Sequence, residues 1–496
     1  MSGDPHPAGP PASAAAADTE SARLAGTPIV LLVASLRWPI AARLGLAFAE
    51  LGCHVEVLCP RGHPARATRA IARIRRHSVL DPLGSIRTAI ASCGPDLILP
   101  CDDDAAMQLC AVHAEAGRTG RAQSAIADRI GRSLGVPAAY TRMTQRGELA
   151  ILAAELGLRT PATSVVATRG DMQRWLERNG FPAVLKLDTT WGGQGVTIVA
   201  SEEEALRVFD TMSSRPPAVK SLARVLLDRD LKYALRALSR ERPSITVQKY
   251  IDGTPANRAV ACWDGELLAG ASVEALRTQH ATGPATVVRV IESEEMTEAT
   301  KRLVQHLRVS GLWGLDFVVE RNTRAAYLIE VNPRATPICH LWIDGSRSLP
   351  LALYSKVTAR PPRQLPPTIH SRVIALFPGE WQRDPFSSFL DSTYHDVPWH
   401  EPRLVREGIE LPWAERGVVA RLWARGRQRA PAASLQNESP ALRMAGGTDP
   451  RSASASSRSQ PPRAAAVGET RNDGADDNTR AAPTSESARS ASDRTP

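Results

Sequence analysis

Gly314-Leu-Asp316-Phe-Val-Val-Glu320 and Tyr327-Leu-Ile-Glu330-Val-Asn332-Pro-Arg334 are two apolar runs that carry acid, amide and guanidinium side chains among strand-forming residues. A polar turn rich in arginine separates the two runs, which predicts a β-hairpin. Because side chains alternate along a strand, Glu330 and Asn332 share one face of it. Asp316 joins them if the register of the hairpin brings it opposite.

The polar side chains of this hairpin have the chemistry of a metal and phosphate site. Asp316, Glu330 and Asn332 offer the hard oxygen ligands that suit Mg²⁺ (or Mn²⁺), which takes one or two carboxylates and fills its other positions with water and substrate phosphates. Arg334 follows in the same frame and can present a planar fork of donors to a phosphate. The alternative is a surface hairpin with scattered polar residues.

A second element lies upstream, where a strand, a glycine-rich turn and another strand follow one another. The strand Phe181–Leu187 contains Lys186 and runs into Asp188-Thr-Thr-Trp-Gly192-Gly193-Gln194-Gly195, after which Val196–Ala200 reads as a strand again. Glycines let backbone N–H groups approach an anion closely, and a lysine in an apolar strand needs an anionic partner. The alternative is an ordinary hairpin turn beside a lysine that reaches solvent.

The order of these elements resembles the ATP-grasp superfamily, which includes biotin carboxylase, the carbamoyl-phosphate synthetase large subunit and the D-alanine ligases. The match runs over roughly residues 141–360 and includes a helix from Arg146 that leads to Gly157-Leu-Arg-Thr-Pro161. The resemblance implies that Arg146 and Lys186 bind phosphates and that Gly192, Gly193 and Gly195 belong to the loop that closes over the triphosphate. It also implies that Asp316, Glu330 and Asn332 bind Mg²⁺ and that Arg334 binds phosphate.

The hinge that holds adenine in that superfamily resembles Gln248-Lys249-Tyr250-Ile251, with main-chain groups of Lys249 and Ile251 at the adenine edge. The chain departs from the usual pattern at three places. Arginine replaces lysine at 146, glutamine replaces glutamate at 248, and Thr254–Arg258 lacks the carboxylate that often follows the hinge. We therefore expect an unusual ribose contact and unusual substrate specificity.

The resemblance implies an ATP- and Mg²⁺-dependent ligase that joins a small-molecule carboxylate to an amine, or to another nucleophile, through an acyl phosphate. Lys186 and Arg334 would act in phosphoryl transfer, which depends mainly on positioning and charge neutralisation. Two alternatives stay open: a non-catalytic ATP-binding module, and a nucleic-acid binder that uses the net charge of +9. We expect no nucleic-acid partner, and the relatives that this chain resembles allow a homodimer.

The chain of 496 residues is long enough for two or three domains. Both ends consist of small and polar residues with almost no large apolar side chain, which is typical of disorder. The predicted fold class is mixed α/β and α+β. We expect a disordered extension (1–27), an open parallel α/β domain of the pre-ATP-grasp type (28–140), a two-lobed ATP-grasp domain (141–365), an appended segment (366–427) and a disordered tail (428–496).

The N-terminal domain shows alternating strands and helices from residue 28 onward. Strands are predicted at 29–33, 54–58 and 96–100, with helices at 40–51 and after residue 104. Because ligands bind at the carboxyl ends of such strands, Ser35, Arg37, Asp102 and Asp103 are candidates for substrate contact. The alternative is that Asp103 or Asp104 simply caps the following helix.

Further along the chain, Asp264-Gly265 signals a hairpin, and a polar loop follows it. Arg277 and Arg289 are either contacts for an acid substrate or partners in surface ion pairs. Ser201-Glu-Glu-Glu204 predicts a capped helix that ends near residue 212. The segment after residue 366 is dense in aromatic residues and forms either a cap or a docking surface.

Several features bear on the class and location of the protein. Seven dispersed cysteines without a Cys-x-x-Cys pair indicate a reducing, cytoplasmic location and no zinc site. No apolar run approaches the roughly 20 residues of a membrane helix, so we expect no membrane association. Arginines recur at helical spacing and are interpreted as one solvated helix face rather than a nucleic-acid site: Arg66, Arg69, Arg73 and Arg76.

Overall fold

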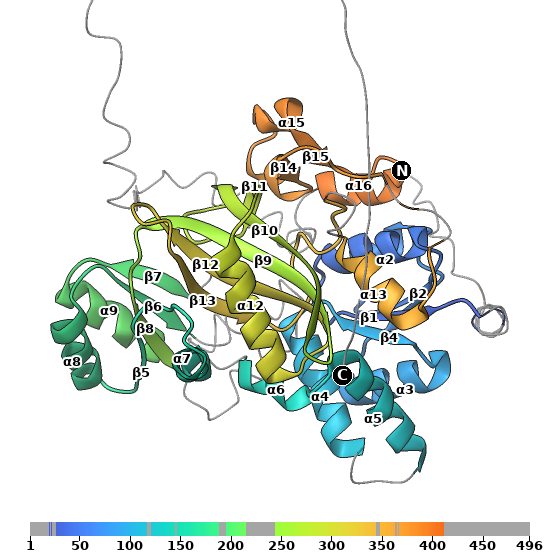
Figure 1. The fold of residues 1–496 in the computed structure, drawn as a ribbon, viewed down its shortest axis with the longest axis horizontal. Helices are drawn as coiled ribbons and strands as arrows, with labels where there is room; N and C mark the ends of the chain where they lie inside the picture. The colour runs from blue at the N-terminus through green and yellow to red at the C-terminus, as the bar shows by residue number, and fades with distance from the viewer. Residues whose placement is uncertain are drawn as a thin grey trace, which may run out of the picture. The chain divides into compact units, whose positions relative to one another are not determined.

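The computed structural model describes residues 26–410, apart from 117–120, 144–145, 188–194, 215–243, 344–347, 363–364 and 366, together with residues 19 and 21. The segments predicted to be disordered, 1–27 and 428–496, lie outside the described residues except for positions 19, 21, 26 and 27. The described residues form a mixed α/β structure with three sheets (Figure 1), as the sequence predicts.

The first sheet is parallel and has the strand order β3-β2-β1-β4. Its central strand β1 (Ile29–Val33) is buried along its whole length, which explains the unbroken apolar run in its sequence. The predicted open parallel α/β arrangement is confirmed. The other elements of this layer are β2 (His54–Cys59), β3 (Arg73–Arg76), β4 (Leu97–Pro100), α2 (Ile40–Glu50), α3 (Pro82–Cys93), α4 (Asp103–Ala116) and α5 (Arg121–Leu134).

The interpretation of four spaced arginines as one helix face is wrong. Arg66 lies in the short 3₁₀ helix η1 (Pro64–Ala67), whereas Arg73 and Arg76 belong to β3, which pairs in parallel with β2. Strand pairing from Glu56 to Cys59 overrides the local spacing because it depends on a partner that is distant in sequence. Arg73 and Arg76 therefore lie on the edge strand of the sheet, and the four arginines share no helix face.

The second sheet has the order β5-β8-β6-β7, and all its neighbours are antiparallel. Helices α8 and α9 pack against it through Trp175 and Phe209, which share a core with Leu185 and Val247. Helix α9 begins after Ser201, whose hydroxyl accepts the Glu204 N–H at 3.2 Å, as predicted. The elements are β5 (Thr163–Val166), β6 (Ala183–Leu187), β7 (Val196–Val199), β8 (Ile245–Lys249), α8 (Arg169–Asn179) and α9 (Glu202–Ser213).

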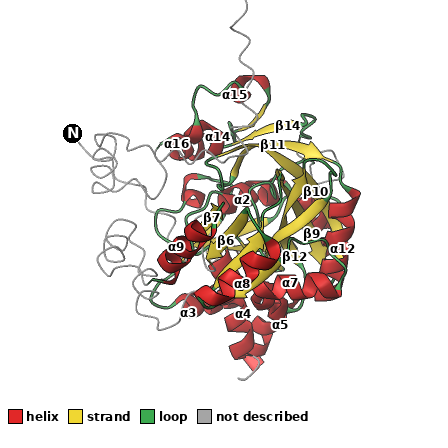
Figure 2. Ribbon diagram, turned by 90° about the vertical axis from the view of Figure 1, so that its left-hand side faces the viewer, coloured by secondary structure: helices red, strands yellow, loops and turns green. Residues whose placement is uncertain are grey.

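The third sheet is the largest, with the order β13-β12-β9-β10-β11-β14-β15. Asp264 and Gly265 both have positive φ and close the predicted β9–β10 hairpin. Helix α12 crosses β9 and β10 on one face of the sheet (Figure 2). The elements are β9 (Gly253–Trp263), β10 (Glu266–Thr278), β11 (Ala285–Ile291), β12 (Gly311–Glu320), β13 (Ala326–Asn332), α12 (Glu294–Leu307) and α13 (Leu349–Thr358).

The described part of the C-terminal segment continues this third sheet. Strand β14 (Val373–Leu376) pairs with β11, and β15 (Tyr394–Asp396) pairs with β14. Glu380, which is fully buried, accepts a hydrogen bond of 2.6 Å from Thr286 Oγ1 on β11 and so joins the segment to the sheet. The helices of this segment are α14 (Gly379–Arg383), α15 (Phe389–Ser392) and α16 (Pro402–Ile409).

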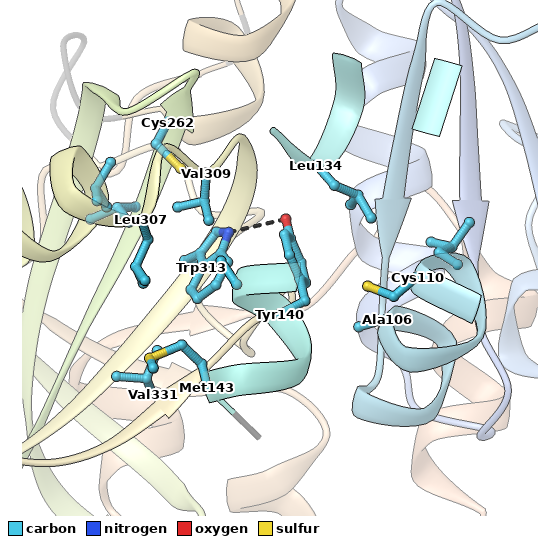
Figure 3. Close-up of a cluster of buried hydrophobic side chains, with 14 of the residues drawn as sticks. Ala106, Cys110, Leu134, Tyr140, Met143, Cys262, Leu307, Val309, Trp313 and Val331 are labelled. Atoms are coloured by element: carbon cyan, nitrogen blue, oxygen red, sulfur yellow. Dashed lines mark hydrogen bonds between the residues drawn. The ribbon is translucent and has the colours of Figure 1, made fainter. Parts of the chain in front are cut away.

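A buried cluster joins the helices of the N-terminal layer to β12 of the third sheet (Figure 3). Tyr140 on α6 (Pro137–Met143) packs edge-on against Trp313, and the Trp313 indole N–H donates to the Tyr140 hydroxyl at 3.1 Å. Leu134 and Met143 belong to the same cluster. This cluster holds Trp313 of β12, which lies three residues before Asp316. Among the described residues, no helix is long and apolar enough to cross a membrane.

The loop that follows β1 is held by a single buried carboxylate at the end of β4. Asp102 is fully buried and accepts hydrogen bonds from the N–H and hydroxyl of Ser35, from the Leu36 N–H and from the Ala105 N–H. The last bond caps α4, so the cap is Asp102 rather than Asp103 or Asp104 as one alternative predicted.

Replacing Asp102 with alanine should lower the free energy of unfolding by roughly 3 kcal/mol, because buried N–H and O–H donors lose their acceptor. The measurement is the urea midpoint of the full chain. Asp128→Ala, at an exposed position of α5, is the matched control and should keep the wild-type midpoint. Equal midpoints for both variants would contradict this role of Asp102.

Candidate functional site

The predicted hairpin of acid and amide side chains is confirmed. Strands β12 and β13 are antiparallel, Asp316 lies directly opposite Glu330, and Gly314 lies opposite Asn332. A bulge follows the Asp316 position, because Phe317 pairs with Leu328. The three residues predicted as metal ligands therefore stand together on one face of two adjacent strands.

Asp316 is the centre of a hydrogen-bonded set of side chains. Its two carboxylate oxygens accept from Asn257 Nδ2 at 2.6 Å and from Asn332 Nδ2 at 2.8 Å. Burial, together with the negative charge of Glu330, raises the pKa of Asp316 above its usual range. The two amide donors act in the opposite direction and favour the ionised form.

Arg334 connects the hairpin with the N-terminal layer. Its guanidinium donates to Asp103 Oδ2 at 2.9 Å and to Asn332 Oδ1 at 3.0 Å, and it lies over the Trp38 ring at 4.8 Å from the ring centroid. Its side chain is 11% exposed. Since Trp38 follows β1 and Asp103 begins α4, the carboxyl ends of two parallel strands meet the hairpin at this residue.

The four candidate substrate contacts of the N-terminal layer have different surroundings. Asp103 contacts Arg334 directly. Ser35 is bound to Asp102 and therefore supports the loop, while Arg37 Nε donates to the Arg61 carbonyl at 2.8 Å. Of the four, Asp103 is the one that the structure joins to the hairpin.

Two residues of this site were missed as site residues by the sequence reasoning. Asn257 lies in Thr254–Arg258, which the sequence marks only by its lack of a carboxylate, and Trp38 lies beside Arg37 in the turn after β1, where no motif singles it out. The first strand of the hairpin predicted at Asp264-Gly265 is β9, which starts as early as Gly253, and in its register Asn257 pairs with Asp316. Extending the first strand of the predicted hairpin back through residue 257 would therefore have revealed Asn257 as a neighbour of the metal strands.

Lys186 and the predicted nucleotide hinge lie on adjacent strands of the second sheet. Lys186 is buried in β6, where it pairs with Thr246 of β8. Gln248 is also buried, and its amide donates to Thr163 Oγ1 at 3.0 Å. The Lys249 N–H donates to the Ala162 carbonyl at 2.8 Å, and the Tyr250 N–H donates to the Pro182 carbonyl at 3.2 Å. Ile251 lies in the short connection between β8 and β9.

Other predicted phosphate contacts lie at the border of the described chain. Gly192 and Gly193 are outside the described residues, whereas Gly195 has a φ of +75° and accepts the Leu187 N–H at 2.9 Å. Arg146 is the first residue of α7 (Arg146–Glu155), but its side chain is outside the described part. Their assigned roles stay predictions.

The two arginines suspected of binding an acid substrate have other partners. Arg289 Nε donates to Glu274 Oε1 at 2.6 Å, so the ion-pair alternative describes its contacts. Arg277 lies over the Phe389 ring at 5.2 Å and donates to the Leu276 carbonyl at 2.8 Å. Neither contact joins these arginines to the hairpin.

The donor set of the hairpin fits a magnesium ion. Asp316 and Glu330 face each other, and two adjacent carboxylates of this kind attract a cation. Asn257 Oδ1 is buried and has no hydrogen-bond partner among the described residues, although it lies beside Asp316. Among the described residues, no group of three or more His, Cys, Asp or Glu side chains lies close enough to hold a metal ion.

Part of this chain is similar in sequence to known proteins. Residues 225–337 match the family described as ATP-grasp domain. The C-terminal section of the carbamoyl phosphate synthase large chain of Aquifex aeolicus is 27% identical over 190 residues, which covers 37% of this chain and 30% of that protein. The carbamoyl phosphate synthase large chain of Vibrio vulnificus is 29% identical over 227 residues, which covers 45% of this chain and 19% of that protein.

Among solved structures, a beta-gamma-ATP complex of biotin carboxylase from Campylobacter jejuni aligns with a TM-score of 0.49 and 14% identity. The alignment covers 68% of this chain and 72% of that one. The present chain spans less than a third of the length of either carbamoyl phosphate synthase relative.

Gly314 is the place where the hairpin meets the loop that carries Arg334. A Cβ at this position would overlap with Thr336 Cγ2. We expect Gly314→Ala to displace that loop and to lower the thermal midpoint of unfolding. Thr336→Ser removes the overlapping methyl group, so the double variant Gly314→Ala/Thr336→Ser should recover much of the loss. A Gly314→Ala protein that melts like the wild type would contradict this close packing.

Proposed function

Since this chain belongs to the ATP-grasp superfamily, we propose that it is an ATP- and magnesium-dependent ligase that joins a carboxylate to an amine, or to another nucleophile, through an acyl phosphate. The observation that carries the proposal is the facing pair Asp316 and Glu330, flanked by Asn332 and Arg334. Two opposed carboxylates with an adjoining guanidinium suit a cation and the phosphate groups that it binds.

In this proposal Asp316, Glu330 and Asn332 hold Mg²⁺ (or Mn²⁺), which when bound neutralises charge on the phosphates of ATP. The side-chain oxygen of Asn332, Oδ1, has two lone pairs. It can therefore accept a hydrogen bond from Arg334 with one of them and bind the metal ion with the other. Asn257 holds Asp316 in place through its amide N–H. It is a positioning residue, and its second amide atom, Oδ1, is buried without a hydrogen-bond partner in the described chain.

The cationic side chains would neutralise the group in transfer. Arg334 stays charged beside Asp103 and keeps its orientation through the Trp38 ring. Lys186 is buried in β6, the strand that runs into the segment with Gly192, Gly193 and Gly195. We propose that it binds a phosphate of ATP, with Arg146 and the loop containing Gly192, Gly193 and Gly195 contributing further contacts.

The reaction would proceed in two steps. A substrate carboxylate oxygen attacks the γ-phosphorus of ATP, and ADP leaves. The nitrogen of the amine then attacks the acyl carbon, loses a proton, and inorganic phosphate leaves. Asp103 and Trp38 of the N-terminal layer contact Arg334, and we propose that the substrate binds in this region. The nucleotide base would lie against Gln248, Lys249, Tyr250 and Ile251.

A non-catalytic ATP-binding module is the second candidate, and one observation favours it. Gln248, at the position where relatives often have glutamate, is buried and donates its amide to Thr163 within the second sheet. A side chain used in this way offers less to a ribose hydroxyl. Tight ATP binding without turnover on any acid and amine would favour the module.

The direct test is ADP formation by the full chain with Mg·ATP against pooled small carboxylic acids and amines. Turnover should appear only when both an acid and an amine are present, and Lys186→Ala should abolish it. Lys301→Ala, on an exposed position of α12, is the matched control and should leave turnover unchanged. ATP binding with no turnover from any pool would overturn the ligase and retain the module.

Glu330→Gln should abolish Mg²⁺-dependent ATP turnover and weaken Mn²⁺ binding, which can be measured by electron paramagnetic resonance. The variant should keep the wild-type fold, because glutamine has nearly the same size and shape as glutamate, and a thermal unfolding midpoint checks this. Glu320→Gln, at the far end of β12, is the control with the same charge change. Wild-type Mn²⁺ affinity in Glu330→Gln would exclude this residue as a metal ligand.

A further inference from the structure

A buried carboxylate of the C-terminal segment contacts two elements that support the candidate site. Asp396 lies in β15, the last strand in the order of the third sheet. Its carboxylate accepts a hydrogen bond from Arg43 Nη2 and another, of 2.8 Å, from His340 Nε2. The side chains of Arg43, His340 and Asp396 are 11%, 8% and 3% exposed, so the contacts lie in the interior of the protein.

The backbone of Asp396 is held by the sheet. Strand β15 pairs in parallel with β14, with Asp396 beside Leu376, and β14 pairs with β11. Burial acts to raise the pKa of Asp396, but Arg43 and His340 outweigh it and keep the pKa below its usual range. The carboxylate is therefore ionised at neutral pH and can only accept hydrogen bonds.

The contact with Arg43 holds the start of α2. Arg43 lies in the first turn of this helix, where its N–H donates to the Pro39 carbonyl at 3.1 Å. Trp38, over whose ring the Arg334 guanidinium lies, directly precedes Pro39. Among the described residues, Asp396 is the carboxylate that pairs with Arg43. A change at Asp396 would therefore reach the end of the helix that carries Trp38.

The contact with His340 holds the loop that carries Arg334. In this loop the Cys339 N–H donates to the Thr336 carbonyl at 3.0 Å, and the Thr336 N–H donates to Cys339 Sγ at 3.2 Å. The two hydrogen bonds close a turn over residues 336–339. Arg334 stands two residues before this turn and His340 directly after it. A displacement of His340 would therefore move the turn and, with it, Arg334.

Removing one partner of a buried ion pair usually destabilises a protein, so burial alone does not distinguish a support of the site from a support of the fold. The place of the two partners makes the distinction here. One carboxylate binds the helix that follows Trp38 and also the loop of Arg334, and these are the two surfaces that meet where the guanidinium lies over the ring.

We propose that Asp396 is a positioning residue that keeps the Arg334 guanidinium oriented toward a phosphate. It acts through Arg43 on the start of α2 and through His340 on the loop. The described part of the C-terminal segment is then a support of the site and not a separate docking surface. This inference rests on the phosphate contact of Arg334 in the proposed function.

Hydrogen–deuterium exchange of the full chain without ligand tests whether Asp396 holds both elements. In Asp396→Asn, peptides that span residues 36–46 and 333–343 should exchange faster than in the wild type, because both charge-assisted contacts are weakened. Asp391→Asn makes the same charge change at an exposed position of the same segment and should exchange like the wild type in these peptides. Wild-type exchange of either peptide in Asp396→Asn would overturn the linkage.

Binding of a non-hydrolysable Mg·ATP analogue, measured by calorimetry, tests whether the linkage acts through Arg334. Asp396→Asn and Arg334→Ala should each raise the Kd at least about fivefold, since a charge-assisted contact to phosphate is weakened or lost. The double variant should bind no more weakly than Arg334→Ala alone. Losses that multiply in the double variant would show a general structural effect and overturn the positioning role.

Wild-type affinity in Arg334→Ala would refute the phosphate contact in the proposed function, and the positioning role would fall with it. Multiplied losses, by contrast, would refute the positioning role and leave that phosphate contact standing. The two failures are therefore distinguishable by the single Arg334→Ala variant.

His340→Gln and His340→Leu provide a second test that keeps the ion pair of Arg43 with Asp396. Glutamine places an amide N–H near the position of Nε2, so it should keep the Kd within about twofold of the wild type. Leucine cannot donate and should reproduce the loss seen in Asp396→Asn. Equal binding by both variants would overturn the role of His340. Urea midpoints establish that all variants are folded.

Discussion

The antiparallel register that sets Asp316 opposite Glu330 is the constraint on which the site depends. A slip by one residue would turn Asp316, Glu330 and Asn332 to the apolar face that holds Leu315 and Val331. The register is secured from both sides, since β12 also pairs with β9 along its whole length. The same pairing brings Asn257 to Asp316, so one set of backbone hydrogen bonds places the carboxylates and the amide that orients one of them.

Arg334 links the hairpin to the N-terminal layer. Its contacts with Asp103 and Trp38 require the loops after β1 and β4 to lie at fixed positions, and Asp102 supplies that rigidity by binding Ser35, Leu36 and Ala105. Charge and packing thus cooperate across elements that are more than two hundred residues apart. A substrate held in this region would be positioned by the parallel sheet and would react at the antiparallel one.

Local signals predicted well where the local pattern and the tertiary contacts agree. The hairpin from 314 to 332, the buried Lys186 strand and the parallel order of the first layer all follow from alternation or from unbroken apolar runs. The helix predicted from the arginine spacing between residues 66 and 76 was wrong. Helical periodicity carries no information about β2, the strand whose pairing makes β3 a strand. The alternative that Asp103 or Asp104 caps α4 was likewise wrong, since Asp102 accepts the capping hydrogen bond from Ala105. The orientation of Asp102 also depends on hydrogen bonds from Ser35, which is distant in the sequence.

The sequence by itself determined the types of side chain at the site and their alternation along each strand, since these depend only on neighbouring residues. It thereby established the mixed α/β class, the acid and amide set of the hairpin and the lysine of β6. Only the tertiary structure decided that Asn257 orients Asp316 and that Trp38 and Asp103 hold Arg334. Each of these contacts joins strands or loops that are distant in the chain, and chain closure over such distances is set by sheet pairing and core packing rather than by local spacing.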